Sequence, residues 1–264
     1  MGFSLNTDAT VSFTVEAVND TGQKSSEGNV MSKNLYARLA GLTSATVSIQ
    51  LLKHGYRAVY IGGVQPLSPD QPTIAGPAYT LRCLPFREDL CDPAKLGDTE
   101  SSQRKTIEEA PPGSVIVIET RGDTSAGVMG DILATRMRVR GVAGLVTDGA
   151  VRDVAGVTAS GFPVVCASAT APANIASFSD GGRQLAIACG GVCVVPGDAI
   201  IADHDGAIVI PADLLEAVVD DGEKQEAFEA WVLGEVEAGQ GIFGLYPPDE
   251  ETRARYEASK AQQD

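Results

Sequence analysis

The feature that most constrains the fold of this chain is a series of short apolar, β-branched runs with one helical segment among them. Ser114–Glu119 reads SVIVIE, and Ala143–Thr147 and Pro163–Ala167 are two further apolar runs. Met129–Arg140 lies between the first two runs and is typical of a helix. Runs of this kind predict buried strands. Strand–helix–strand units with hairpin-like strands around them predict an α/β fold with a mixed sheet.

Further elements are expected on both sides of this centre. Lys33–His54 is expected to be helical, because apolar residues recur there at a three-to-four spacing. Residues 87–108 are charged and loop-like. Ala212–Gly239 is expected to be helical, with an interruption near Gly222. Short additional strands are expected at Ala58–Ile61, Ala78–Leu84, Val192–Val195 and Ala207–Ile210.

The sequence divides into a polar start and one long remainder. Residues 1–30 are dominated by polar side chains and have no clear helical period, which predicts a tail or leader. The remainder shows neither an internal repeat nor a linker. We therefore expect residues 31–264 to form a single α/β domain with a C-terminal helical extension.

Composition and charge exclude several classes of partner. The 264 residues contain 20 Lys and Arg against 35 Asp and Glu, which gives a net charge of −15. Nucleic acids and anionic membranes bind basic surfaces, so we expect neither as a partner. No segment approaches the ~20 apolar residues of a membrane span, and the first residues lack the pattern of a secretory signal. These observations predict a soluble, cytoplasmic protein.

The cysteines favour the same compartment. Their number is odd and none has the C-x-x-C spacing, so a metal or redox motif is not indicated. We expect buried free thiols in a reducing environment at Cys83, Cys91, Cys166, Cys189 and Cys193.

The common catalytic signatures are missing from the sequence. It contains no P-loop, no well-placed dinucleotide-binding glycine motif, no nucleophile elbow and no H-E-x-x-H motif. With two histidines, a Ser-His-Asp or His-rich metal site is not expected. Carboxylates, arginines and glycine-rich turns remain, and they are densest at residues 119–131 and 147–153.

These two clusters each follow a predicted buried strand, at the edge where open α/β sheets bind ligands. The first cluster also opens a helix, whose amide groups suit a carboxylate or phosphate. Arg152 can add a bidentate grip on the same anion. Asp131 and Asp153 offer hard oxygen ligands, which favour Mg²⁺ or Mn²⁺ over Zn²⁺. A purely structural interpretation stays open, because Asp-Gly pairs form turns and Arg-Asp can be a surface pair or a helix cap.

Two segments of the sequence resemble the core motif of one family. They are GDILAT, starting at Gly130, and RGVAGLVTDGAVRD, ending at Asp153. The family comprises 4-hydroxy-4-methyl-2-oxoglutarate aldolases and regulators of ribonuclease E activity (RraA-like proteins). Its motif is an Asp, twenty residues and then Arg-Asp, and residues 132–151 number twenty. The resemblance extends over about residues 33–250 through Ile74–Ala78, Pro196–Asp198, Asp203–Pro211, Glu229–Trp231 and Gly244–Pro247.

This resemblance implies a swivelling β/β/α domain that assembles as a homotrimer or hexamer, with active sites at subunit interfaces. It also implies class II aldolase chemistry, which uses a divalent metal (here Mg²⁺ or Mn²⁺). By this resemblance Asp153 binds the metal, Asp131 reaches the metal or its water, and Arg152 holds the carbonyl or the developing enolate. Glu229 of a neighbouring subunit completes the site. The substrate carboxylate is held by the amides around Gly130, Asp131, Ile132 and Leu133.

The function implied is a lyase that cleaves a 4-hydroxy-2-oxo acid to pyruvate. Negative charge builds on the C2 oxygen during cleavage, and a metal and a guanidinium stabilise it. Oxaloacetate decarboxylation passes through the same enolate and is expected as a side activity. Two alternatives stay open: a non-catalytic regulator of ribonuclease E-like enzymes, and a metal-dependent dehydratase or hydrolase of a sugar-derived acid.

Two parts of the chain depart from the compact aldolases of this family. Residues 87–104 are longer and more acidic, and Arg121 and Asp123 make the loop after the first strand more polar. Either departure can reshape the substrate pocket. Arg121 and Asp123 otherwise form a local ion pair, worth ~0–1 kcal/mol.

Overall fold

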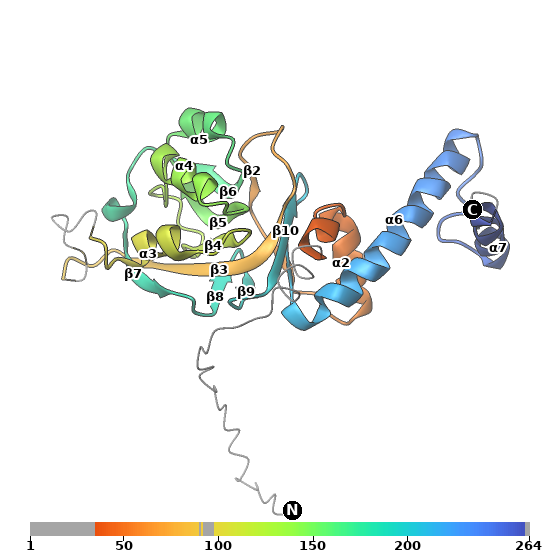
Figure 1. Cartoon of the computed structure of the whole chain (residues 1–264), viewed down its shortest axis with the longest axis horizontal. Helices are drawn as coiled ribbons and strands as arrows, with labels where there is room; N and C mark the ends of the chain where they lie inside the picture. The colour runs from red at the N-terminus through yellow and green to blue at the C-terminus, as the bar shows by residue number, and fades with distance from the viewer. Residues whose placement is uncertain (1–34, 90, 92–97, 262–264) are drawn as a thin grey trace, which may run out of the picture.

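The computed structural model describes residues 35–89, 91 and 98–261 (Figure 1). Within these residues nine strands form one sheet: β1 (Tyr60–Ile61), β2 (Gln65–Pro66), β3 (Ile74–Pro85), β4 (Val115–Glu119), β5 (Gly144–Val151), β6 (Val164–Ala169), β7 (Phe178–Arg183), β10 (Ala199–Asp203) and β11 (Gly206–Ile210). Their order is β1-β11-β10-β3-β4-β5-β6-β2, and β7 pairs with β3 off this path. The run β3-β4-β5-β6 is parallel and the other pairs are antiparallel. The predicted α/β fold with a mixed sheet is therefore confirmed.

The parallel centre of the sheet is built from the segments that the sequence identified. Helix α4 (Asp131–Val139) connects β4 to β5, and helix α5 (Val154–Ser160) connects β5 to β6. All five residues of β4 and all eight of β5 are buried, as continuous apolar runs require. Gly161, with φ of 71°, ends α5 in the left-handed conformation that suits glycine. This arrangement brings the carboxyl ends of β4, β5 and β6 to one edge.

Strand β3 holds the two halves of the sheet together. Ile74–Pro77 pair with β10, whereas Ala78–Arg82 pair in parallel with β4. The end of β3 then pairs with β7, across a register shift between Leu81 and Cys83. One strand of 12 residues therefore connects the antiparallel β10–β11 part to the parallel part.

Three apolar clusters form the core around this sheet. Alternate residues of β4 enter different clusters, since Ile116 and Ile118 face one side and Val115 and Val117 the other. The first side is covered by α4, α5 and α3 (Ser102–Glu109), and the second by the hairpin of β8 (Ile187–Cys189) and β9 (Val192–Val194). The third cluster packs α2 (Ser44–Lys53) and the start of α6 (Leu215–Glu237) against β10 and β11.

The C-terminal helices form an arm that leaves the body of the molecule (Figure 1). At 1.5 Å per residue, the 23 residues of α6 span about 35 Å. Helix α7 (Glu250–Lys260) returns to α6, where the Tyr256 ring lies 5.1 Å from that of Phe228 and 5.5 Å from that of Trp231. The expected interruption at Gly222 is wrong. A Cβ at Gly222 would lie 2.6 Å from Leu42 Cδ1, so this glycine allows close packing inside an unbroken helix.

Two other expectations need correction. Residues 87–108 were expected to be loop-like, but residues 102–109 form α3, whose N-cap Ser101 accepts a hydrogen bond from the Arg104 amide at 3.3 Å. Cys83, Cys166 and Cys189 are buried as expected, whereas Cys193 is exposed and Cys91 is intermediate. Cys193 points outward because it lies between the buried residues Val192 and Val194 of a strand, where successive side chains alternate.

The predicted tail or leader at residues 1–30 lies outside the described residues. That residues 31–264 form a single domain stays a prediction. Among the helices of the described residues, none is both long and apolar enough to cross a membrane.

Candidate active site

The loop before α4 is fastened to the end of β5 by backbone hydrogen bonds. Val128 N donates to Ala150 O at 2.8 Å, and Arg152 N donates to Met129 O at 3.0 Å. A Cβ at Gly127 would lie 2.9 Å from Arg152 N, so only glycine allows this close approach. The two sequence clusters at residues 119–131 and 147–153 are therefore joined into one structural unit.

Asp153 is held in a left-handed backbone conformation, with φ of 55° and ψ of 42°. Few residues other than glycine adopt this conformation, and Asp and Asn are among those that do most readily. Arg152 Nε donates to Asp153 Oδ2 at 3.1 Å, and the two side chains are 37% and 42% exposed. An ion pair this exposed contributes about 0–1 kcal/mol to stability. Both groups are therefore available to a ligand at little energetic cost.

Two glycines make room for two carboxylates. A Cβ at Gly130 would lie 2.4 Å from Asp153 Oδ2, and a Cβ at Gly156 would lie 2.7 Å from Asp131 Oδ2. Asp131 Oδ1 accepts a hydrogen bond from the Ile132 amide at 2.7 Å. These contacts bring Asp131 and Asp153 to the start of α4 together with Arg152.

The amino end of α4 is open to a ligand, because no side chain caps it. Its N-cap is Gly130, which makes no side-chain cap hydrogen bond. Ile132 is 79% exposed, and its amide donates to Asp131 Oδ1. The positive end of the helix dipole favours an anion at such a position.

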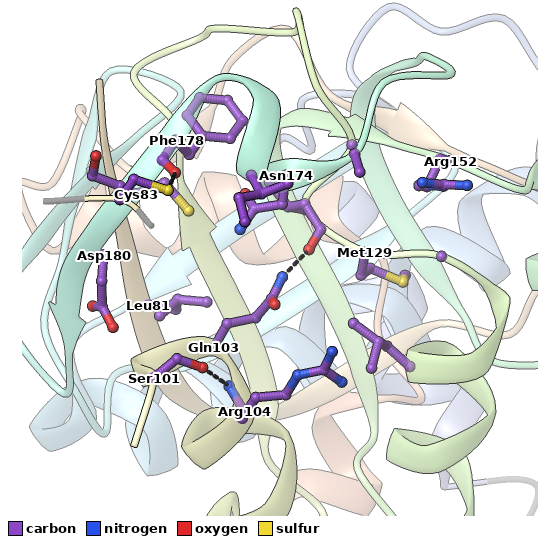
Figure 2. A pocket seen from close by; sticks show the side chains of 18 of the residues that line it. Leu81, Cys83, Ser101, Gln103, Arg104, Met129, Arg152, Asn174, Phe178 and Asp180 are labelled. Atoms are coloured by element: carbon purple, nitrogen blue, oxygen red, sulfur yellow. Dashed lines mark hydrogen bonds between the residues drawn. The ribbon is translucent and has the colours of Figure 1, made fainter. Parts of the chain in front are cut away.

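A cavity of about 670 Å³ opens beside these residues (Figure 2). Arg152, Asp153 and the segment from Gly130 to Leu133 line one part of it. Another part is lined by the start of α3 and by residues 173–175 and 178–180. The start of α3 belongs to residues 87–104, which the sequence predicts can reshape the substrate pocket, whereas residues 173–175 and 178–180 were not identified from the sequence. The contributing residues come from separate segments and belong to no recognisable motif.

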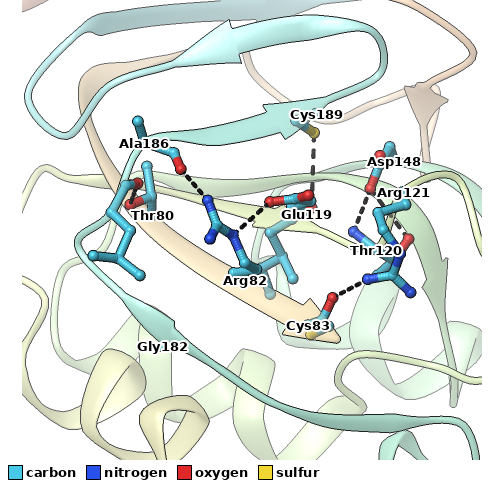
Figure 3. A network of polar contacts seen from close by, with 12 residues as sticks. Thr80, Arg82, Cys83, Glu119, Thr120, Arg121, Asp148, Gly182, Ala186 and Cys189 are labelled. Carbon is cyan, nitrogen blue, oxygen red and sulfur yellow. Dashed lines mark hydrogen bonds and ion pairs between the residues drawn. The ribbon is translucent and has the colours of Figure 1, made fainter. Parts of the chain in front are cut away.

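A buried polar network around Asp148 supports the loop that follows β4 (Figure 3). Asp148 Oδ1 accepts hydrogen bonds from Thr120 N at 2.6 Å and from Thr120 Oγ1 at 3.1 Å. Asp148 Oδ2 accepts hydrogen bonds from Gly122 N at 3.0 Å and Gly190 N at 3.3 Å. This carboxylate is fully used by the fold, so the structural interpretation holds for Asp148.

Arg121 does not form the expected local ion pair within the described residues. Its guanidinium donates to the Cys83 carbonyl oxygen instead. Asp123 Oδ1 accepts the Ser125 amide at 2.9 Å, and hydrogen bonds from Ser125 are the main reason why the pKa of Asp123 lies below its usual value. Arg121 thus ties the loop after β4 to the end of β3.

Comparison with known proteins now identifies the family. The family model described as "RraA-like: Aldolase/RraA" matches residues 43–209, which include the whole site described above. The chain belongs to the RraA-like family. A protein of Halalkalibacterium halodurans named "Putative 4-hydroxy-4-methyl-2-oxoglutarate aldolase" is 35% identical over 152 residues, covering 56% of this chain and 72% of the relative.

Solved structures agree with this family assignment. Streptomyces coelicolor RraAS2, described as an unusual member of the RNase ES inhibitor RraA protein family, has a TM-score of 0.68 and 32% identity. That alignment covers 75% of this chain and 94% of RraAS2. A protein of Pseudomonas syringae pv. tomato has a TM-score of 0.72 over 81% of this chain and 93% of its own, and at 22% identity it shows the fold alone. The predicted family resemblance is confirmed.

Glu229 lies apart from the cavity of its own chain in this RraA-like protein. It belongs to the C-terminal arm, where its Oε1 accepts hydrogen bonds from Gln225 Nε2 at 2.9 Å and Tyr246 Oη at 3.0 Å. The bond to Glu229 raises the pKa of Tyr246. The cavity-lining residues do not include any part of the arm.

The donor set at the site suits a hard divalent cation. Asp131 and Asp153 provide carboxylate oxygens. The described residues contain no larger metal-binding group, that is, none of three or more His, Cys, Asp or Glu side chains. Mg²⁺ is commonly bound by one or two carboxylates and keeps its other positions for water and substrate oxygens. The two aspartates therefore fit Mg²⁺ or Mn²⁺ better than Zn²⁺, which takes three or four protein ligands rich in His and Cys.

Proposed function

We propose that this RraA-like protein is a divalent-metal-dependent lyase that cleaves a 4-hydroxy-2-oxo acid to pyruvate. The observation that supports it most strongly is the meeting of Arg152, Asp131 and Asp153 at the open start of α4, on the wall of a cavity. The name of the relative from H. halodurans supports the same substrate class.

The residues of the site can divide the reaction among them. The amides of Gly130, Asp131 and Leu133 hold the substrate carboxylate at the start of α4, where the Ile132 amide donates to Asp131 Oδ1. Arg152 faces the C2 oxygen and stabilises the negative charge that develops there as the C3–C4 bond breaks. Asp131 accepts the proton of the C4 hydroxyl, directly or through water. A divalent ion held by Asp153 and Asp131 would supply additional positive charge for the enolate.

Electron flow in this scheme also accounts for a second reaction. When the C3–C4 bond of oxaloacetate breaks, the bonding electrons move to the C2 oxygen and CO₂ leaves in place of an aldehyde or ketone. Arg152 meets the same developing charge in both cases. We therefore expect oxaloacetate decarboxylation as a side activity of the same residues.

We also propose that the chain assembles as a homotrimer or hexamer, in which Glu229 of a neighbouring subunit approaches the cavity. The C-terminal arm carries Glu229 away from its own body (Figure 1). The far part of this arm exposes large apolar side chains, with Leu233, Ile242 and Phe243 exposed by 59%, 57% and 98%. Ile242 and Phe243 adjoin in the sequence, and adjoining exposed apolar residues are expected on surfaces that another chain covers. Light scattering of the wild type tests the assembly, and mixing Glu229→Gln with Arg152→Ala subunits tests the shared site: restored activity supports it, and none counts against it.

The experiment for the proposed activity is pyruvate release with Mg²⁺ or Mn²⁺ and then with EDTA. The substrates are oxaloacetate and 4-hydroxy-4-methyl-2-oxoglutarate. Asp153→Asn keeps a residue that tolerates the left-handed backbone and removes the charge, and Arg152→Ala removes the guanidinium. Both should abolish release, whereas Arg138→Ala, an exposed position outside the cavity, should not. Full release by either site variant would refute the assignment.

One observation favours a second function. RraAS2, at 32% identity, is described as belonging to an RNase inhibitor family. As a non-catalytic regulator, the chain would bind a ribonuclease E-like enzyme, and the Asp153→Asn variant would bind equally well in a pulldown. A third chemistry, dehydration or hydrolysis of a sugar-derived acid, would yield a product other than pyruvate, which mass spectrometry distinguishes.

A further inference from the structure

Arg104 stands out among the charged groups on the cavity wall. Three arginines line the cavity, and two of them are paired, Arg82 with Glu119 at 3.1 Å and Arg152 with Asp153 at 3.1 Å. Within the described residues the Arg104 guanidinium has neither a hydrogen bond nor an ion pair. Figure 2 shows this side chain extending from the start of α3 into the cavity.

The position of Arg104 is unfavourable for the helix that carries it. It lies in the first turn of α3, which contains no acidic residue. The positive end of the helix dipole disfavours a cation there. A residue that breaks a local rule without a compensating contact is expected where a function requires it.

Three of the acidic side chains that line the cavity, Glu100, Asp180 and Asp98, are already engaged by the fold. Glu100 Oε2 pairs with Lys105 Nζ at 2.6 Å. Asp180 accepts the amides of Ser102 at 2.6 Å and Gly182 at 2.8 Å. Asp98 Oδ1 accepts the Glu100 amide at 2.9 Å. Among the described residues, Arg104 is therefore the cation of this wall that is left for a ligand.

Two neutral polar side chains also line the cavity. Gln103 Nε2 donates to Val128 O at 2.6 Å, which fixes its amide against the wall (Figure 2). Asn174 Oδ1 is buried and has no hydrogen-bond partner among the described residues. A buried polar atom without a partner is costly unless a ligand or water supplies the missing bond.

We propose that Arg104 binds an anionic group at the end of the substrate remote from the 2-oxo acid head. This inference rests on the proposed function, because it takes the Arg152 end of the cavity as the site of that head. The remote anion is either a carboxylate or a phosphate, and both would meet the guanidinium in the bidentate manner that arginine supports.

The test measures binding, so that it does not depend on turnover. Isothermal titration of the full chain with Mg²⁺ compares 2-oxopentanoate with 2-oxoglutarate. Both have five carbons, only the second has a remote carboxylate, and neither has the C4 hydroxyl that cleavage requires. A third ligand, 2-oxo-4-phosphonobutanoate, replaces that carboxylate by a phosphonate.

In the wild type we expect 2-oxoglutarate or the phosphonate to bind about 10- to 100-fold more tightly than 2-oxopentanoate. The anionic ligand whose affinity exceeds that of 2-oxopentanoate by the larger factor identifies the remote group. Arg104→Ala should remove this advantage and leave 2-oxopentanoate binding unchanged, Arg104→Lys should keep part of it, and Arg138→Ala should keep all of it. Circular dichroism confirms that each variant is folded.

The outcomes separate this inference from the proposed function. If all three ligands bind equally, or if the preference survives in both Arg104 variants, the role of Arg104 is refuted while the 2-oxo acid site stands. If none of the ligands binds to the wild type, the proposed function and this inference fail together.

Discussion

Replacing Gly130 by alanine should disable the site while leaving the fold intact. The new Cβ would lie 2.4 Å from Asp153 Oδ2, whereas ordinary contact begins at 3.4 Å, so the carboxylate must move by about 3.4 − 2.4 = 1.0 Å. A misplacement of ~1 Å at a reacting centre costs about 100-fold in rate. The backbone does not resist the change, because φ of −130° is accessible to alanine. Loss of a glycine N-cap costs at most about 1 kcal/mol.

The assay is pyruvate release at several Mg²⁺ concentrations, with thermal unfolding measured on the same samples. Gly130→Ala should lower kcat/KM about 100-fold and require more Mg²⁺. The control is Arg138→Ala, an exposed position on the same helix that lies outside the cavity. That control should leave both activity and the requirement for Mg²⁺ unchanged. Activity of Gly130→Ala within threefold of wild type would show that the crowding of Asp153 has no part in function.

Four other outcomes are expected. Asp148→Asn should destabilise the chain by about 2–4 kcal/mol in urea unfolding, because its amide nitrogen would face backbone N–H groups that now donate to a carboxylate. Iodoacetamide at neutral pH should modify exposed Cys193 and spare Cys83, whose pKa burial raises to about 12. The stability that Cys83 contributes as a neutral thiol should be complete below the thiol pKa of the unfolded chain and be lost as pH rises towards about 12, which melting at pH 8 and pH 11 would check. Tyr256→Ala should shift the fluorescence of Trp231, the single tryptophan, and weaken the arm by ~1–3 kcal/mol, whereas unchanged emission would contradict the packing of α7 on α6.

The elements that sequence predicted well are those whose own residues determine their environment. The continuous apolar run Val115–Glu119 suits a strand that is buried on both faces, and it forms β4. Helix α3 was missed because only Thr106 and Ile107 are buried, so it has no apolar stripe, although its Ser101 cap was readable. Gly222 was misread because the reason for a glycine lies on another helix, at Leu42.

The residues of the candidate site also divide into those that the sequence identifies and those that only the fold brings to the site. Asp131, Arg152 and Asp153 could be found because they follow predicted strands at a spacing typical of the family, and the structure brings them together. Arg104 belongs to residues 87–104, which the sequence connected with the pocket as a segment, whereas only the three-dimensional fold places Asn174 at the same cavity. Tertiary packing decides which residues far from the motif in sequence line the same cavity, and the local sequence says little about that packing.

The left-handed backbone at Asp153 has a consequence for how this family can diversify. Asp, Asn and Gly are the residues that such a position accepts most easily, and among them Asp alone is charged. A single nucleotide change converts an Asp codon into one for Asn or Gly. A lineage could therefore lose its lyase chemistry in one step while its surface, its assembly and its fold persisted. A fold in which one codon change can remove the charge of this carboxylate is suited to a family whose model is described as "Aldolase/RraA" and whose member RraAS2 is described as belonging to an RNase inhibitor family.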